Sequence, residues 1–344
     1  MNGTSVSLVK VKGDVIQAVR EAMELAKWRD YIPHKADVSL KPNLGWDLFL
    51  PGAVTSSWVV EGVIQTIREH VGQIYIVEAG QILVDVEKAL KQTGLAALVE
   101  KYQLKWVNMS KGGFERVNLP RGLILKEAQV PEILLHTTLI TIPVMKTHGK
   151  TTITGAVKNQ WGCLPEFRHN YHLVVNEVLV DINSIAKPKF AVMDATVCLE
   201  GDGPKSGRPK IMDLVLASGD AVALDSVQAQ VMGFDPLKIE HLANCSRAGL
   251  GVYRPDKITV VGERISDVRD SFVPAKNNTV SVVELFLRRS SFLRKIVFHT
   301  FILKICCWGA LVWYFFWYYF GVGKKYRDEI LKHPFYGKQW RDVR

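Results

Sequence analysis

Cysteine is scarce in this sequence of 344 residues, and its pattern excludes several classes of protein. The five cysteines are Cys163, Cys198, Cys245, Cys306 and Cys307. No pair has the CxxC spacing of zinc and iron–sulfur sites, so neither kind of centre is expected, and the cofactor, if any, stays unknown. The odd number, with an N-terminus that lacks the apolar core of a signal peptide, predicts a body in the reducing cytoplasm.

Excess positive charge is also scarce over most of the chain, although the formal net charge is +10. From Arg288 to Arg344 there are twelve Lys and Arg residues and three acidic residues, a net charge of +9. Residues 1–287 therefore carry only about one excess positive charge, which is too little to indicate a nucleic-acid-binding surface. The basicity belongs to the C-terminal tail.

Long apolar runs are absent until the tail, where Ile305–Val322 has eighteen residues without a charge and is rich in aromatics. As a helix this run spans about 27 Å, close to the hydrocarbon core of a bilayer at about 30 Å. Basic clusters flank it and suit an anionic lipid surface. We expect a membrane helix and leave open whether it crosses the bilayer or lies in its plane. The tail also leaves open a homo-oligomer or a membrane partner.

Predicted strands and helices alternate along the rest of the chain, which indicates an α/β fold with mostly parallel sheets. We expect two lobes with a cleft between them, residues 1–145 and 146–287, followed by the membrane-anchoring tail of residues 288–344. Strands are expected at residues 4–11, 36–40, 73–77, 105–108, 123–128, 139–145, 190–197, 214–217 and 258–261.

The stretch from Lys146 to His172, KTHGKTTITGAVKNQWGCLPEFRHNYH, follows the apolar run at residues 139–145. It is dense in lysine, histidine and threonine, and Glu166 is its one carboxylate. In open α/β sheets, ligands sit at the carboxyl ends of strands. The stretch therefore predicts a site for an anionic ligand.

Four separated blocks carry a resemblance to a known family. They are KPN at residues 41–43, LITIPVMKTHGKTTITGAVKNQWG, MDATVCLEGDGP and SGDAVALDSVQAQVMGFDP. Their order over residues 35–265 resembles the prokaryotic family known as domain of unknown function 362. Many members of that family carry a ferredoxin-like module, and this chain has no such cysteine motif.

The second of these blocks, which contains His148 and Lys158, has a weaker likeness to the nickel-pincer lactate racemases. That likeness implies a racemase-like fold, with His148 and Lys158 placed as a pocket histidine and a cofactor-tethering lysine, and His169 and His172 near a further pocket histidine. Lys41 would take the place of a substrate-binding arginine. The glycine-richer loop of those enzymes is replaced here by Thr-Thr-Ile-Thr-Gly, so a nickel-pincer cofactor is not supported.

Chemistry divides the candidate residues into two groups. Those expected to act as acids, bases or nucleophiles are His148, Lys158, His169 and His172. Those expected to bind substrate are Lys41, Asn43, Lys146, Lys150, Thr154, Asn159, Glu78, Glu200 and Asp202. No metal ligand set is predicted. Asp225, in an apolar helical run, is a candidate for a buried acid paired with a lysine.

These observations lead to one leading function and one alternative. The leading function is a membrane-anchored cytoplasmic enzyme, racemase- or oxidoreductase-like, that acts on an anionic carboxylate or phosphate substrate by proton or hydride transfer. The substrate is a small molecule or a lipid with an anionic headgroup. The alternative is a non-catalytic anion-binding or scaffold protein at the membrane surface.

Overall fold

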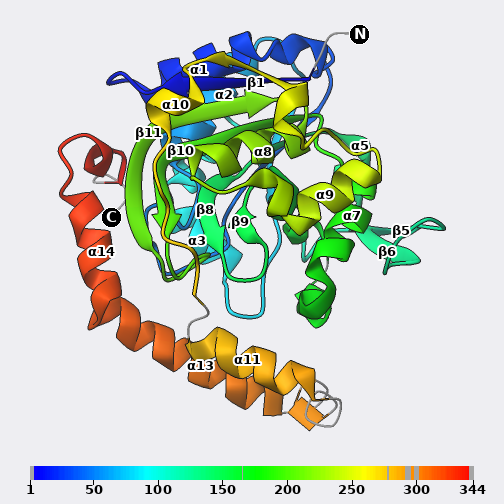
Figure 1. Cartoon of the computed structure of the whole chain (residues 1–344), viewed down its shortest axis with the longest axis vertical. Helices are drawn as coiled ribbons and strands as arrows, with labels where there is room; N and C mark the ends of the chain where they lie inside the picture. The colour runs from blue at the N-terminus through cyan, green and yellow to red at the C-terminus, as the bar shows by residue number, and fades with distance from the viewer. Residues whose placement is uncertain (1–3, 165, 277–278, 291–295, 298–301, 341–344) are drawn as a thin grey trace.

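The computed structural model describes residues 4–164, 166–276, 279–290, 296–297 and 302–340. A ten-stranded mixed sheet forms its centre (Figure 1). The order is β12-β1-β11-β10-β7-β2-β3-β4, with β8 beside β10 and β9 beside β8. Its strands are β1 (Thr4–Lys10), β2 (Val38–Pro42), β3 (Ile74–Glu78), β4 (Lys105–Asn108), β7 (Thr138–Ile142), β8 (Val144–His148), β9 (Thr152–Thr154), β10 (Phe190–Glu200), β11 (Arg208–Ser218) and β12 (Ile258–Gly262).

Helices cover both faces of this sheet. One apolar cluster packs α1 (Val15–Leu25), α2 (Ser57–Ile67), α3 (Val86–Gln92) and α4 (Leu95–Lys101) on one face. A second packs α6 (Ala156–Asn159), α7 (Val175–Ile185), α8 (Ala221–Val231) and α9 (Glu240–Arg247) on the other. Strands such as β2 and β10 are buried along their whole length, because both faces of the sheet are covered.

Shorter elements complete the body. A separate two-stranded sheet pairs β5 (Phe114–Asn118) with β6 (Glu127–Pro131). The remaining helices are α5 (Glu132–His136), α10 (Ile265–Val268) and the 3₁₀ turns η1 (Trp28–Asp30), η2 (Gln160–Cys163), η3 (Glu166–Val174), η4 (Pro236–Lys238) and η5 (Pro255–Lys257).

The predicted α/β class with a mostly parallel sheet is confirmed, but the predicted pair of lobes is not observed. Strands from both sides of the expected boundary at residue 145 pair in one sheet: β1 lies between β11 and β12, and β7 lies beside β10. The cleft predicted between two lobes is not shown by this arrangement. The domain boundaries themselves stay a prediction.

Two local expectations differ from the structure. The single strand expected at residues 139–145 is two strands, β7 and β8, because Pro143 lies between them and has no N–H to donate to a ladder. The strand expected at residues 123–128 begins later, as β6, and its partner β5 was not expected at all. Short strands with exposed polar residues give little alternation to detect.

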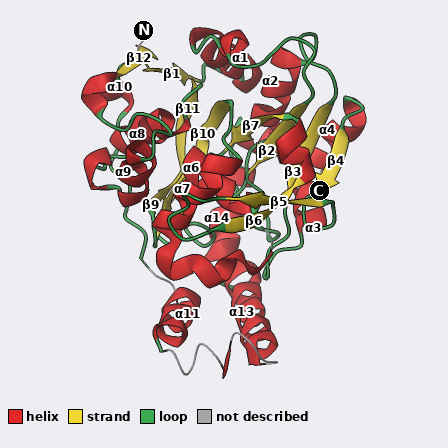
Figure 2. Ribbon diagram, turned by 90° about the vertical axis from the view of Figure 1, so that its right-hand side faces the viewer, coloured by secondary structure: helices red, strands yellow, loops and turns green. Residues whose placement is uncertain are grey.

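In the structure the C-terminal tail begins with α11 (Thr279–Arg289), earlier than the residues 288–344 expected from the sequence, and its helices leave the body and return to it (Figures 1 and 2). α11 and α13 (Ile302–Tyr319) lie beneath the body, and α14 (Val322–Leu331) and the turn η6 (Tyr336–Trp340) lead back along its side. Among the described residues, α13 alone is long and apolar enough to cross a membrane, and only 17% of it is buried. A core helix of a soluble protein would be mostly buried.

The tail contacts the body on both sides of α13. Before it, the Glu284 carboxylate on α11 accepts a hydrogen bond from Lys150 at 3.1 Å. At its end, the Tyr318 hydroxyl donates to the Phe49 carbonyl at 2.7 Å. After it, the Tyr336 hydroxyl donates to Asp213 at 2.6 Å. The described parts of the tail before and after α13 therefore both contact the body.

Candidate functional site

The candidate site lies where parallel strands end. β2, β3, β7, β8 and β10 run parallel to one another, so their carboxyl ends meet at one edge of the sheet. Lys41, Glu78, Lys146 and His148 stand at or near those ends. The hairpin of β8 and β9 then brings in the turn that leads to Lys158.

Buried polar pairs form the floor of the site. Lys41 and Glu78 form an ion pair at 2.9 Å with their side chains 1% and 4% exposed, so their charges neutralise each other. Lys146, 2% exposed, donates to the Asn43 side chain at 2.9 Å and to the Ala53 carbonyl at 2.8 Å. Burial, with nearby lysines, lowers the pKa of Lys146 to about 7.

Asparagine side chains hold this floor together. Asn43 donates to the Asn159 side-chain oxygen at 3.0 Å. Asn159, which is buried, donates to the Lys41 carbonyl at 3.1 Å and to Thr141 at 2.9 Å. The KPN block on β2 and the KN pair on α6 are thus joined directly, although 116 residues separate the two asparagines.

A buried carboxylate positions Lys158. Asp225 on α8 accepts hydrogen bonds from the backbone N–H groups of Ala156 at 2.6 Å and Val157 at 2.9 Å. Gly155 permits this approach, because a Cβ there would lie 2.1 Å from an Asp225 oxygen. The expectation that Asp225 pairs with a lysine is therefore wrong: its partners are backbone N–H groups, and burial raises its pKa to about 7.

Lys158 faces the site over the ring of Trp161, with its Nζ 4.9 Å from the ring centroid. No ion pair joins Lys158 to a carboxylate among the described residues. Desolvation, and the neighbouring charges of Arg168, Lys150 and Lys146, lower the pKa of Lys158 well below that of a free lysine. A bound anion would raise the pKa of Lys158 again.

His148 is held in one tautomer by its surroundings. The backbone N–H of Lys150 donates to Nδ1 of His148 at 3.0 Å, so in the neutral ring the proton lies on Nε2. Desolvation, with the charges of Lys158 and Lys150, lowers the pKa of His148 well below its ordinary value. His148 is therefore a neutral imidazole whose Nε2–H can donate.

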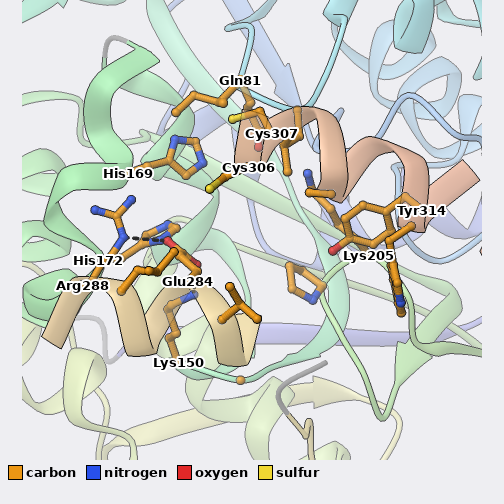
Figure 3. Close-up of a pocket in the computed structure, with 18 of the residues that line it drawn as sticks. Gln81, Lys150, His169, His172, Lys205, Glu284, Arg288, Cys306, Cys307 and Tyr314 are labelled. Carbon is orange, nitrogen blue, oxygen red and sulfur yellow. Dashed lines mark hydrogen bonds and ion pairs between the residues drawn. The ribbon is translucent and has the colours of Figure 1, made fainter. Parts of the chain in front are cut away.

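His172 is held in the opposite tautomer by a carboxylate from the tail (Figure 3). Its Nδ1 lies 2.5 Å from the Glu284 carboxylate, and its ring stacks on Trp161 at 5.8 Å. Glu284 also pairs with Lys150 at 3.1 Å and Arg288 at 2.8 Å. Burial acts to raise the pKa of Glu284, but the His172 hydrogen bond and these cations outweigh it and lower the pKa. The ionised carboxylate keeps the proton on Nδ1 and leaves Nε2 as an acceptor.

The side chains enclose two adjoining cavities. The inner chamber, of about 80 Å³, is lined by polar residues that include Lys41, Glu78, Lys146, Thr154 and Asn159. The outer chamber, of about 500 Å³, lies between the site and the helices α11 and α13 (Figure 3). Six residues line both chambers and so join them: Gln81, His148, Lys158, Trp161, Pro204 and Lys205.

Most of the residues predicted from the sequence meet at these chambers. Eleven of the thirteen line one or both, namely Lys41, Asn43, Glu78, Lys146, His148, Lys150, Thr154, Lys158, Asn159, His169 and His172. Glu200 and Asp202 line neither. Glu200 lies 3.6 Å from Lys210 and accepts the Val273 N–H, and Asp202 offers its carbonyl to Ser206. Glu200 and Asp202 therefore shape the turn that carries Lys205.

Several residues at the site were not predicted from the sequence. They are Gln81, Trp161, Arg168, Lys205, Glu284 and Arg288. Glu284 and Arg288 come from the tail, and the one local signal is an isolated acid in an apolar helical run with an arginine four residues later. Burial lowers the pKa of Lys205 to about 8, although the Asp47 carboxylate acts to raise it.

The donor atoms present do not make a metal site on their own. Among the described residues no three His, Cys, Asp or Glu side chains converge as ligands. One nitrogen of His148 and one of His172 are already engaged in hydrogen bonds.

The fold and the site define an α/β protein with a buried cationic and imidazole cluster at the carboxyl edge of its sheet. The chain belongs to the family described as Domain of unknown function (DUF362), whose model matches residues 38–230. That range contains β2 to most of α8, and with them the inner chamber, but not the tail.

A curated relative and two solved structures are similar to this chain. A thylakoid-associated protein of Synechocystis sp. is 26% identical over 263 residues, which cover 72% of this chain and 80% of that protein. The lactate racemase apoprotein from Thermoanaerobacterium thermosaccharolyticum matches at 13% identity with a TM-score of 0.40, over 72% of this chain and 57% of that one. A protein from Thermotoga maritima matches at 10% identity with a TM-score of 0.41, over 71% and 61%.

The chain spans less than two thirds of either solved structure. At these TM-scores the two structures do not indicate the chemistry of this site, which must be argued from its own residues.

Proposed function

We propose that this protein is an enzyme that binds an anionic carboxylate or phosphate substrate and moves a proton on it. The observation that carries the proposal is a pair of histidines held in opposite tautomers beside one lysine. His172 offers an unprotonated Nε2, and His148 offers a protonated one. A base and an acid of matched chemical type in one cavity are what an isomerase or racemase needs.

The chain's residues would act as follows. His172 Nε2 takes a proton from the substrate carbon next to the carboxylate, and the electron pair moves onto the carboxylate as an enolate. Lys158 lies beside that developing charge, and its ammonium form stabilises it. His148 Nε2–H returns a proton to the carbon, and the imidazolate that this leaves regains a proton, through solvent, from the imidazolium formed on His172, so that protons and electrons balance. Glu284 is a positioning residue, because it holds His172 in the tautomer that can accept.

Cationic groups in the inner chamber support an anionic substrate. Lys146, Lys158 and Lys205 have no carboxylate within ion-pair distance among the described residues, whereas Lys41 is neutralised by Glu78. Three buried or partly buried ammonium groups that repel one another favour a ligand with negative charge. A carboxylate or phosphate group meets this need.

We also propose that the protein works at a membrane surface, with α13 in the plane of the bilayer. α13 and the residue that follows it expose aromatic side chains, among them Trp308 at 68%, Phe316 at 58% and Phe320 at 74%. An in-plane helix is favoured over a crossing one by the contacts that hold the tail to the body on both sides of α13. The body and both ends of the helix then lie on one side of the membrane, which we take as the cytoplasmic side.

Deuterium exchange tests the proposed chemistry whatever product the enzyme releases. The full chain is incubated in D₂O with a panel of 2-hydroxy carboxylates of short and long chain, and exchange of the proton on the carbon next to the carboxylate is followed by NMR. We expect exchange with at least one compound, and a loss of at least 100-fold in His172→Asn and in His148→Asn. Burial lowers the pKa of His172 to about 4, and the Glu284 carboxylate opposes this shift, so Glu284→Gln should move the acidic limb of the pH profile to lower pH.

Sulfate binding provides the control for folding, because sulfate needs cations and no proton transfer. His172→Asn should keep sulfate affinity within a few fold, and Lys158→Ala should weaken it at least tenfold. Sulfate binding without exchange of any carboxylate would contradict the enzyme and support the alternative of a non-catalytic anion-binding protein. Exchange that persists in both histidine variants would contradict the roles given to the two histidines.

A further inference from the structure

We propose that the ligand of this site is an anionic amphiphile taken from the bilayer, with its charged group in the inner chamber and its hydrocarbon chain in the outer chamber. This inference rests on the proposed function and names the class of substrate. It is carried by the contrast between the two joined chambers, one small and cationic, the other large and walled by the apolar tail helices.

The inner chamber has unmet hydrogen-bonding capacity as well as charge. Thr154, 4% exposed, has no partner for its hydroxyl among the described residues. Trp161, 6% exposed, has none for its indole N–H within the same part of the chain. Buried polar groups are almost always paired, and each unpaired one costs about 1–3 kcal/mol. A carboxylate or phosphate beside Lys158 could accept from both groups.

The outer chamber offers a different surface. At about 500 Å³ it lies in the range of sites for molecules far larger than a carboxylate or phosphate group. Its tail wall includes one stripe of α13 at helical spacing and apolar side chains of α11: Leu303, Cys307, Ala310, Trp313, Val283 and Leu287. Glu284 and Arg288 of α11 also line the chamber and pair with each other, and α13 contributes no charged group, so the α13 side of the wall suits hydrocarbon.

The opposite stripe of α13 explains how such a ligand would arrive. Ile305, Trp308, Phe315 and Phe316 are between 47% and 68% exposed and do not line the chamber. A helix that is apolar on all sides needs apolar surroundings on all sides. With its outer stripe in the bilayer and its inner stripe on the outer chamber, α13 places the chamber next to the lipid. A lipid chain can then pass between the bilayer and the chamber without crossing water.

Affinity measurements with two phosphates, one with and one without a hydrocarbon chain, test this inference. Dodecyl phosphate, below its micelle concentration, and inorganic phosphate are titrated into the full chain by calorimetry. We expect dodecyl phosphate to bind at least 100-fold more tightly, because each methylene buried in the chamber adds to the affinity. Dodecyltrimethylammonium, which has the same chain and the opposite charge, should not bind with comparable affinity.

Substitutions on α13 show whether the hydrocarbon chain of the ligand lies in the outer chamber. Ala310→Trp fills the inner stripe and should weaken dodecyl phosphate binding at least tenfold while inorganic phosphate binding is kept. Leu311→Trp, at a residue 44% exposed and outside the chamber, is the matched control and should bind like the unchanged chain. If Ala310→Trp does not fold, Gly309→Leu serves, since a Cβ at Gly309 meets no atom within 4 Å.

The outcomes separate this inference from the proposed function. If inorganic phosphate binds and the dodecyl chain raises the affinity less than threefold, the inference of an amphiphilic ligand is wrong and the anion site stands. If the dodecyl chain raises the affinity equally in Ala310→Trp and Leu311→Trp, the gain comes from adsorption on the exposed stripe of α13, and the inference is again wrong. If neither phosphate binds, the anion site fails as well.

Discussion

At the scale of single residues, the site depends on charges that the surrounding protein makes costly. Lys146 and Lys158 are desolvated close to other cations, and both have a lowered pKa. A bound anion lowers the cost of their charged forms, so that binding and protonation are linked. Lys41, by contrast, is already paired with Glu78.

Anion affinity should therefore fall as the pH rises. The pKa of Lys146 is about 7, so above this pH Lys146 loses its proton when no anion is bound. An anion can then pair with Lys146 only if the lysine takes up a proton again. Sulfate, which does not titrate in this range, should bind more weakly by up to tenfold for each pH unit between about pH 7 and 9. Calorimetry measures this slope. Lys146→Met should make the slope shallower, and an affinity independent of pH would contradict the linkage.

At the scale of elements, a short turn carries the most important lysine and is fixed from outside. α6 has four residues, too few to be stable alone, and its first N–H groups are held by Asp225 on α8. The Asn159–Asn43 hydrogen bond holds its other end to the segment that follows β2. The position of Lys158 is thus set by two elements that are distant in sequence.

Removing the carboxylate on α8 should disturb both stability and binding. Asp225→Ala leaves two buried N–H groups without acceptors, which should reduce the free energy of unfolding by about 2–5 kcal/mol. Sulfate affinity should fall at least fivefold, because Lys158 is no longer held. Denaturant unfolding and calorimetry measure the two effects.

Asp235 supplies the matched control for this prediction. Its exposed side chain accepts the Leu237 N–H at 2.9 Å and caps η4, away from the chambers. Asp235→Ala should cost about 1 kcal/mol and leave sulfate affinity unchanged. Equal losses of sulfate affinity in the two variants would mean that Asp225 does not position Lys158.

At the scale of the whole molecule, the tail is both a wall of the site and an exposed apolar surface. α14 and η6 attach it firmly, with Tyr336 and Trp340 buried against the body. α11 brings Glu284 to His172, so the site is complete only when the tail is in place. Membrane attachment and chemistry would then be coupled through the same helices.

Binding to vesicles should depend on the exposed stripe of α13. Exchanging Phe316 and Phe320 together for Ser should lower partition into vesicles with anionic lipid at least tenfold, without loss of stability, because both side chains are already exposed. Cosedimentation measures the partition. Leu123→Ser, on the body and 52% exposed, is the control and should have no effect.

The in-plane arrangement has a test of its own on the same vesicles. A biotin attached after Arg344 should be reached by external streptavidin on the face that carries the body. Access only after the vesicles are permeabilised would mean that α13 crosses the bilayer, and that the contacts of Tyr318 and Tyr336 with the body break on insertion.

The sequence by itself determined the α/β class, the family and most of the cationic cluster. Apolar runs and the turns after them are local features, and lysines and histidines just past a strand end can be located without knowing which strands are neighbours. For the same reason the sequence indicated the apolar tail helix and its basic flanks.

Only the tertiary structure decided what each of these residues meets. Pairing of β1 with β11 and β12 placed strands from both predicted lobes in one sheet, since strand order depends on contacts between distant segments. Asp225 proved to hold backbone N–H groups, and Glu200 and Asp202 proved to lie outside the chambers. Glu284 reached His172 from 112 residues away, a contact that no local pattern encodes because folding alone brings the two side chains together.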